Sequence, residues 1–370
     1  MCKYVILSLF CLLVFVIPTR GQAQISATNS QQDSKTYEER AEVTRIIEEQ
    51  LEPKTEAYQV VEIRILSDGP YKSQTFQIDS RTSLLEGLRY IVRVKDQVQI
   101  MLIETENSPP ILYITDIVRL TPLSILFFLF IAVTLLVGRW RGLASLVGLA
   151  VSLLVLFGFI LPRMLAGQNP LAVTLIGSAI ILAMAIFGTH GWRKQSIAAF
   201  AATVAGLGIT GFLATIFTVT IRLTGLASED ASFLQLESGT AINFHGLLLA
   251  GIILGAVGVL DDIAVTQSET VFELQETNPG MSRRELISHA LHIGRHHIAS
   301  VVNTLVLAYA GASLPLLMLF YTTGKPPSEL FNAEFIAEEI VRTLVGTIGL
   351  ILTVPIATWF ASIYASRKNK

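Results

Sequence analysis

Cysteine, charge and catalytic motifs are all scarce in this sequence. Only two of its 370 residues are cysteine, and both, Cys2 and Cys11, lie in the first segment of the chain. If that segment is removed on export, the mature chain has neither a disulfide nor a thiolate. No HExxH, GxSxG or paired-aspartate protease pattern stands in an apolar run, and no Lys/Arg-rich patch carries interleaved aromatics. These absences argue against a hydrolase and against nucleic-acid binding.

Charged residues make up 15% of the chain and hydrophobic residues 52%, and the mean hydropathy is +0.58. A soluble domain rarely carries this balance, whereas the interior of a lipid bilayer requires it. Seven apolar runs approach the length of a membrane-spanning helix: 120–138, 143–161, 171–188, 196–221, 242–262, 297–321 and 341–363. The sequence therefore predicts a polytopic α-helical membrane protein with about seven transmembrane helices.

The start of the chain has the features of an export signal. Lys3 precedes the apolar run Val5–Ile17, and Gly21 and Ala23 are small residues placed for cleavage after Ala23. This pattern predicts a signal peptide over residues 1–23, with a short uncleaved N-terminal anchor as the alternative.

Residues 24–119 form a predicted extracytoplasmic domain. Tyr37–Gln50 is predicted to be a short amphipathic helix, because Val43 and Ile46 recur at helical spacing between charged residues. The segments that follow alternate in polarity and are rich in β-branched residues, which predicts a small β-barrel or sandwich. No nucleophile–base pair or metal-ligand spacing stands in it, so a spacer or binding module is expected.

The connections between the apolar runs predict the orientation in the membrane. Ten basic residues fall on one side: Arg139, Arg141, Arg193, Lys194, Arg283, Arg284, Arg295, Arg367, Lys368 and Lys370. The opposite connections are rich in acidic residues. The positive-inside rule then places the N-terminal domain outside and the tail, residues 364–370, in the cytoplasm.

A predicted cytoplasmic helical hairpin, residues 263–296, carries most of the polar side chains near the membrane. Ser282 and Glu285 fit a capping box that starts its second helix. At 100° per residue, each arm bears a polar stripe. The candidate functional cluster drawn from these stripes and their flanks is Asp262, Glu269, His289, His292, Arg295, His296 and Asn303.

An antiparallel fold of the hairpin would bring Asp262 near His296 and Glu269 near His289. Such pairs would be ionic near neutrality and sensitive to protons. Two alternatives stay open: Asp262 and His296 could bind zinc, manganese or iron, or both stripes could be solvated faces. Asp261 lies about 100° away from the stripe, which favours a structural role. No other cofactor is predicted.

Small residues mark predicted helix contacts. Gly251 and Gly255 form a GxxxG pattern in the fifth run, and we expect it to pack on Gly311 or its neighbour Ala310 in the sixth. Pro315 and Pro355 are expected to bend the last two runs.

Three segments carry a family resemblance: GVLDDIAVTQSETVFEL, IGRHHIAS and NTLVLAYAGASLPLLMLF. They resemble the signature of the YibE/F family of bacterial membrane proteins, and the likeness extends from about Ala57 to the end of the last apolar run. It implies a multi-pass protein of the bacterial cell (inner) membrane and brings no established activity. Similar sequences usually have Asp where this one has His296. This chain therefore lacks a carboxylate pair at positions 262 and 296, which argues against a mechanism that needs one.

Two classes of function follow. One is a transporter or permease for an unknown small solute, with the hairpin as a cytoplasmic gate. The other is a non-transporting sensor or assembly protein whose outer domain and hairpin bind protein partners. Neither class identifies a specific partner other than the lipid bilayer, and neither predicts an oligomeric state.

Overall fold

The computed structural model describes residues 35–50, 58–82, 91–105, 108–238, 242–324 and 326–366. The chain divides into two compact units, one within residues 19–134 and one from Leu135 onward, and each is described by itself. The predicted signal peptide and most of the predicted tail lie outside the described residues.

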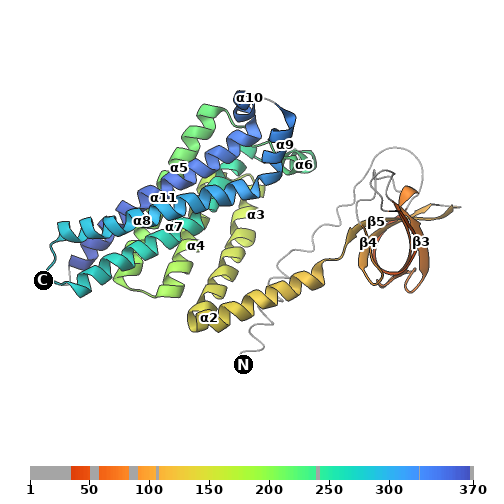
Figure 1. Cartoon of the computed structure of the whole chain (residues 1–370), viewed down its shortest axis with the longest axis horizontal. Coiled ribbons are helices and arrows are strands. Elements are labelled where there is room, and N and C mark those ends of the chain that lie inside the picture. Colours follow the sequence, from red (N-terminus) through yellow and green to blue (C-terminus); the bar gives the residue numbers. More distant parts are fainter. Residues whose placement is uncertain are drawn as a thin grey trace. The chain divides into compact units, whose positions relative to one another are not determined.

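In the described part of the first unit, five strands form one antiparallel sheet (Figure 1): β1 Lys35–Gln50, β2 Tyr58–Ile65, β3 Thr75–Asp79, β4 Gln97–Thr105 and β5 Ser108–Ile117. The strand order is β3-β2-β1-β4-β5, and every neighbouring pair is antiparallel. The edge strands β3 and β5 contact each other, so the sheet curls into a small barrel.

The barrel is filled by aliphatic side chains that point inward from alternate positions. Ile63 and Ile65 of β2 and Ile100 and Leu102 of β4 are all 0–1% exposed. Burying one such side chain contributes about 1.5–3 kcal/mol, so this interior is the main source of stability for the unit.

The prediction of a helix at Tyr37–Gln50 was wrong, because this segment is part of β1. The register with β2 shifts between Val43 and Arg45 and again between Ile46 and Glu48. Each bulge adds a residue and resets the alternation of a strand, so that the apolar positions fall three apart, as in a helix. β1 also pairs with β4 on its other side, and these tertiary hydrogen bonds override the local pattern.

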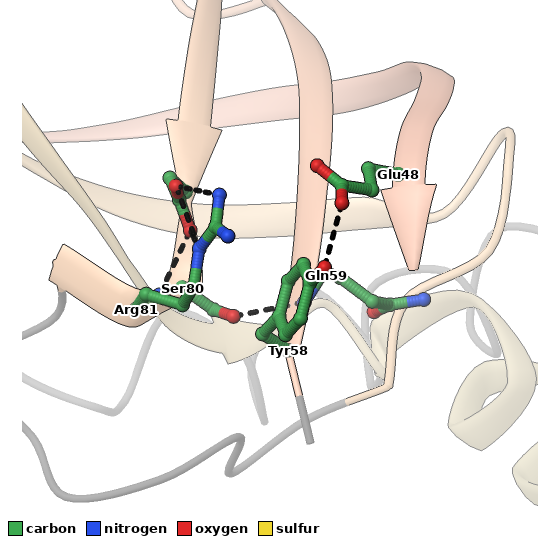
Figure 2. Close-up of polar contacts among 6 residues, drawn as sticks. Glu48, Tyr58, Gln59, Ser80 and Arg81 are labelled. Carbon is green, nitrogen blue, oxygen red and sulfur yellow. Dashed lines mark hydrogen bonds and ion pairs between the residues drawn. The ribbon is translucent and has the colours of Figure 1, made fainter. Parts of the chain in front are cut away.

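Polar side chains join the ends of β1, β2 and β3 (Figure 2). Tyr58 donates a hydrogen bond from its hydroxyl to Glu48 Oε1 at 2.6 Å, which raises the pKa of the Tyr58 phenol. The guanidinium of Arg81 lies 4.2 Å from the centre of the Tyr58 ring. Arg81 also donates hydrogen bonds from Nε and Nη2 to the carboxylate of Asp79 and thereby lowers the pKa of Asp79.

Gln59 closes the same end of the barrel. Its backbone N–H donates to Ser80 Oγ at 2.9 Å (Figure 2), at the start of the 3₁₀ turn Ser80–Thr82. Its side-chain amide exchanges two hydrogen bonds with the backbone of Val92, at 3.1 and 2.9 Å. A buried amide with both of its ends paired fixes the segment around Val92 against β2.

The remaining described residues are almost all helical. The elements are α2 Leu120–Val155, the π-helical turn η2 Leu156–Ile160, α3 Leu161–Leu165, α4 Pro170–His190, α5 Lys194–Ile221, α6 Glu229–Ser238, α7 Phe244–Thr277, α8 Arg283–Ala312, α9 Leu314–Thr323, α10 Pro327–Asn332 and α11 Glu334–Ser366. Among described residues, five helical segments are long and apolar enough to cross a membrane: Leu120–Leu165, Pro170–His190, Lys194–Ile221, Phe244–Thr277 and Glu334–Ala365. The length and the apolar composition of these segments therefore fit a multi-pass membrane protein.

The sixth candidate is a bent pair, α8 with α9, whose axes differ by 68°. The break falls at Ser313, and Pro315 occupies the first turn of α9. Pro315 has no backbone N–H to donate to the preceding turn, so the expected bend is found here. Pro355, by contrast, lies inside α11, which continues to Ser366.

The count of seven spans stays a prediction. Runs 120–138 and 143–161 lie in one helical segment of 46 residues, Leu120–Leu165. A straight helix of that length would measure about 69 Å, roughly twice the thickness of the hydrocarbon core. Arg139, with φ 51° and ψ −129°, interrupts it and leaves a stretch near bilayer length on either side.

Helices α5, α7 and α11 pack together at the centre of the second unit, and α5 meets α11 through a reciprocal contact. A Cβ on Gly206 would lie 2.0 Å from Thr353 Oγ1, and a Cβ on Gly349 would lie 2.0 Å from Thr210 Oγ1. Each threonine donates to the glycine carbonyl one turn earlier in its own helix, which satisfies the hydroxyl. The two GxxxT patterns let the backbones approach closely.

The packing expected through Gly251, Gly255 and Gly311 is found only in part. A Cβ on Gly255 would lie 3.2 Å from the hydroxyl of Tyr309 in α8. Gly251 and Gly311 are exposed, and a Cβ on either would meet no described atom within 4 Å. The close contact between α7 and α8 lies further toward the hairpin turn.

Candidate functional site

The predicted hairpin is formed by α7 and α8, and its second helix begins where the sequence indicated. Ser282 Oγ accepts from the backbone N–H of Glu285, and a carboxylate oxygen of Glu285 accepts from the backbone N–H of Ser282 at 2.9 Å. This capping box satisfies two N–H groups that have no partner inside the helix.

Gln267 holds the two arms together. Its side-chain Nε2 donates to the backbone oxygen of Ala290 at 2.9 Å and to Thr358 Oγ1 of α11 at 2.8 Å. Its Oε1 lies 2.9 Å from the position that a Cβ on Gly294 would occupy. The faces in contact are therefore Gln267 on α7 and Leu286, Ala290 and Gly294 on α8, all of which are buried.

The histidine stripe lies on another side of α8. His292 and His296 are each two residues from a buried contact position, which turns them about 160° away from it. Both are exposed, as are His289, Arg295 and Asn303. The rings of His292 and His296 meet edge to face with centroids 5.2 Å apart.

The structure gives Glu269 a partner on a helix that the hairpin hypothesis did not include. Its Oε1 lies 3.3 Å from Nδ1 of His190, at the end of α4. Asp262 is exposed, and among described residues no ion pair joins it to His296. Nor do the described residues contain a group of three or more His, Cys, Asp or Glu able to hold a metal ion.

The Glu269–His190 pair is one end of the contact between α4 and α7. At the other end a Cβ on Gly246 would lie 2.5 Å from Pro170 Cγ. The two helices therefore run side by side with the same polarity. The 21 residues of α4, Pro170–His190, rise by about 30 Å, which is the thickness of the hydrocarbon core.

Four buried side-chain oxygens on these two helices have no hydrogen-bond partner among the described residues: Thr174 Oγ1 and Ser178 Oγ on α4, and Asp261 Oδ1 and Ser268 Oγ on α7. Thr174, Ser178 and Ser268 are each 0% exposed. An unpaired buried polar group costs about 1–3 kcal/mol. Buried polar groups without a partner are uncommon in folded proteins, so these four mark the two helices as a candidate functional site.

Each end of the α4–α7 contact has a cavity. At the end near Pro170, a cavity of about 310 Å³ has polar side chains from Gln168, Asn169, Thr215 and His245 in its lining. At the other end, His190, Gln195, Ser196 and Glu269 line a space of about 10 Å³. That is about the size of one water molecule.

An apolar cluster fills the middle of the bundle. Leu182 of α4, Leu207 of α5 and Leu260 of α7 are 0–2% exposed and belong to one hydrophobic core. Leu182 lies one turn beyond Ser178 on α4, and Leu260 directly precedes Asp261 on α7. Aliphatic side chains of this cluster therefore follow Ser178 on α4 and precede Asp261 on α7.

The region that carries these groups also carries the family signal. The profile of YibE/F-like proteins matches residues 126–367, which is well over half of the chain.

This chain belongs to the YibE/F-like family.

The match begins inside α2 and runs to the end of α11, so the barrel of β1–β5 lies outside it. No curated protein and no solved structure matches the chain.

The YibE/F-like signature in α7 alternates between buried and exposed polar groups. Gln267 and Ser268 are buried, whereas Asp262 and Glu269 are exposed. Sequence reasoning selected the exposed stripe because it stands at regular helical spacing. The signal for the buried groups was weaker: Asp261 and Ser268 are seven residues apart, which also places them on one face.

Proposed function

We propose that this YibE/F-like protein is a permease that moves protons, alone or with a small solute, along the contact between α4 and α7. Asp261 is the central binding group of this pathway. The observation that carries the proposal is the set of four buried oxygens without partners on these two helices. Ionisable groups inside membrane helices commonly mark ion and proton pathways.

The position of Asp261 suits a relay. It precedes Glu269 by eight residues, which is about 12 Å along α7. A charged carboxylate without a donor is costly in an apolar setting, and a bound proton or cation removes that cost. Glu269 and His190 are 56% and 39% exposed as side chains, so they can exchange protons with water at the inner end.

The aliphatic cluster around Leu182 and Leu260 acts as the barrier in this proposal. Passage requires α4 to shift against α7 so that Ser178 and Asp261 meet through water. The hairpin controls this shift, because Gln267 ties α7 to both α8 and α11. The hairpin is thus the cytoplasmic gate of the permease.

The alternative function, a sensor or assembly protein, is favoured by a different observation. Asp262, His289, His292 and His296 are exposed and form no ion pairs with other described residues. Such a surface suits a cytoplasmic protein partner. The transport experiment separates the two functions.

The test uses the purified full-length protein in liposomes with a pH-sensitive dye inside. A potassium diffusion potential drives proton uptake. We expect uptake faster than in empty liposomes, and we expect Asp261→Asn to reduce the excess rate by about tenfold or more. Asp262→Asn is the matched control, because it removes the neighbouring exposed carboxyl, and it should keep most of the rate.

If Asp262→Asn abolishes uptake and Asp261→Asn does not, the exposed stripe carries the function and the α4–α7 pathway is wrong. If the unmodified protein gives no uptake above empty liposomes, proton permeation is excluded and the sensor or assembly function gains support.

A further inference from the structure

A second open space in the helical unit lies between α2 and α4, away from the α4–α7 contact. It is a groove of about 320 Å³ lined by Trp140, Val147 and Gly148 from α2 and by Met184 and Gly188 from α4, among other apolar residues. Each of these side chains is nonpolar or absent, so the groove suits a hydrocarbon chain.

Two glycines keep this groove open. A Cβ on Gly148 or on Gly188 would meet no described atom within 4 Å. Glycine inside a helix costs about 0.5–1 kcal/mol relative to alanine, and these two gain no packing contact in return. Gly177 on the same α4 differs, because a Cβ there would lie 2.5 Å from Ile160 Cγ1.

Four basic residues lie close in sequence to the groove residues Trp140 and Gly188. Arg139 and Arg141 flank Trp140 in sequence, and Arg193 and Lys194 follow three and four residues after His190, the last residue of α4. All four are exposed. Within the part of the chain that the structure describes, none of the four forms an ion pair.

Each pair of basic residues also has a tryptophan directly beside it in the sequence. Trp140 is 84% exposed and Trp192 is 81% exposed. Tryptophan is enriched where the hydrocarbon core meets the headgroups, beside basic residues. The Lys/Arg distribution of the sequence predicts that this side is the cytoplasmic one, and the cytoplasmic leaflet is rich in anionic lipids.

We propose that the α2–α4 groove is a binding site for an anionic phospholipid. An acyl chain lies along Val147, Gly148 and Gly188, and the headgroup phosphate is held by Arg139 and Arg141, with Arg193 and Lys194 adding positive charge. An apolar groove with basic residues close to it in the sequence matches a lipid that has both a hydrocarbon chain and a net negative charge. The site stands independently of the proposed permease, because it shares no residue with the α4–α7 pathway.

The experiment measures thermal unfolding of the full-length protein, purified in detergent, with added phosphatidylglycerol or phosphatidylcholine of identical acyl chains. We expect phosphatidylglycerol to raise the melting temperature and phosphatidylcholine to have a much smaller effect. Arg139→Gln combined with Arg141→Gln should remove most of the difference between the two lipids. Gly188→Leu, which fills the groove, should remove the stabilisation by phosphatidylglycerol.

Two matched controls accompany these variants. Arg284→Gln removes an exposed arginine from the start of α8 that forms no ion pair with another described residue. Gly208→Leu adds the same side chain as Gly188→Leu at an exposed, uncrowded glycine of α5. Both should keep the full response to phosphatidylglycerol. If they lose it as the groove variants do, binding is a bulk lipid effect and the site is refuted.

Two further outcomes would also overturn the proposal. Equal stabilisation by phosphatidylcholine would remove the role of charge. Equal stabilisation by glycerophosphoglycerol or inorganic phosphate, which lack acyl chains, would show that the groove takes no part. Should Gly188→Leu fail to fold, a phosphatidylglycerol with a photoreactive acyl chain can be cross-linked to the unmodified protein. Adducts must then map to the segments around Val147 and Met184.

Discussion

Gln267 Oε1 lies 2.9 Å from the point where a side-chain carbon on Gly294 would sit, and this contact sets the rotation of α8 against α7. A Cβ at position 294 would crowd the same amide that donates to Ala290 and Thr358. The exposed position of the histidine stripe follows from this rotation.

Gly294→Ala should therefore destabilise the protein. The added carbon would also lie 2.7 Å from Val354 Cγ1, so overpacking is expected to cost about 1–3 kcal/mol. Thermal unfolding in detergent measures the loss as a lower melting temperature. Gly258→Ala, at an exposed glycine of α7 with no described atom within 4 Å, should leave it nearly unchanged. Equal melting temperatures for both variants would contradict the contact.

The reciprocal contact between α5 and α11 gives a second prediction. Gly349→Ala should lower the melting temperature because Thr210 Oγ1 occupies the space of the new carbon. Gly346→Ala is the control, since Gly346 is buried yet has no described atom within 4 Å. Thr210→Ala should recover part of the loss in the double variant, and the recovery measures the coupling of the two sites. Purely additive losses would show that the two residues do not touch.

The barrel should lose stability in acid through Asp79. Arg81 lowers the pKa of this carboxyl from its ordinary value of 3.8, so folding favours the charged form. The stabilisation is therefore complete above that ordinary value and is lost as the pH falls through the lowered pKa. Because the Asp79 and Arg81 side chains are 27% and 50% exposed, screening by solvent keeps this contribution small.

Arg81→Gln tests this pH dependence in the full-length protein. Hydrogen exchange of β2 and β3 should be faster than in the unmodified protein at neutral pH, and the difference should vanish in acid. Lys72→Gln, which breaks a more exposed pair with Asp68, should have little effect at any pH. A difference for Arg81→Gln that persists in acid would assign its effect to packing on Tyr58.

The orientation in the membrane is testable by labelling. After Cys2 and Cys11 are replaced, Thr75→Cys in β3 should react with an impermeant thiol reagent on intact cells. Lys368→Cys in the tail should react only after the cells are opened. The physical reason is the one-sided distribution of Lys and Arg. Labelling of the tail on intact cells would reverse the orientation.

The sequence by itself determined the features that depend on local chemistry. Long apolar runs specify membrane helices whatever their neighbours are, because an isolated helix already satisfies its own backbone. The capping box at Ser282 and the bend at Pro315 are equally local, since each depends on hydrogen bonds within one turn. The family was also readable from its motifs.

Tertiary structure decided everything that depends on which elements meet. β1 is a strand because β2 and β4 pair with it on both sides, a fact that its bulged, helix-like spacing concealed. His190 precedes Glu269 by 79 residues, and no local pattern shows that α4 and α7 run side by side. The spacing of a polar stripe shows which residues share one face of a helix. It does not show how the helix is rotated, and therefore whether that face points toward a neighbouring helix or toward solvent. That rotation depends on close packing at a few small residues, here Gly294 against Gln267.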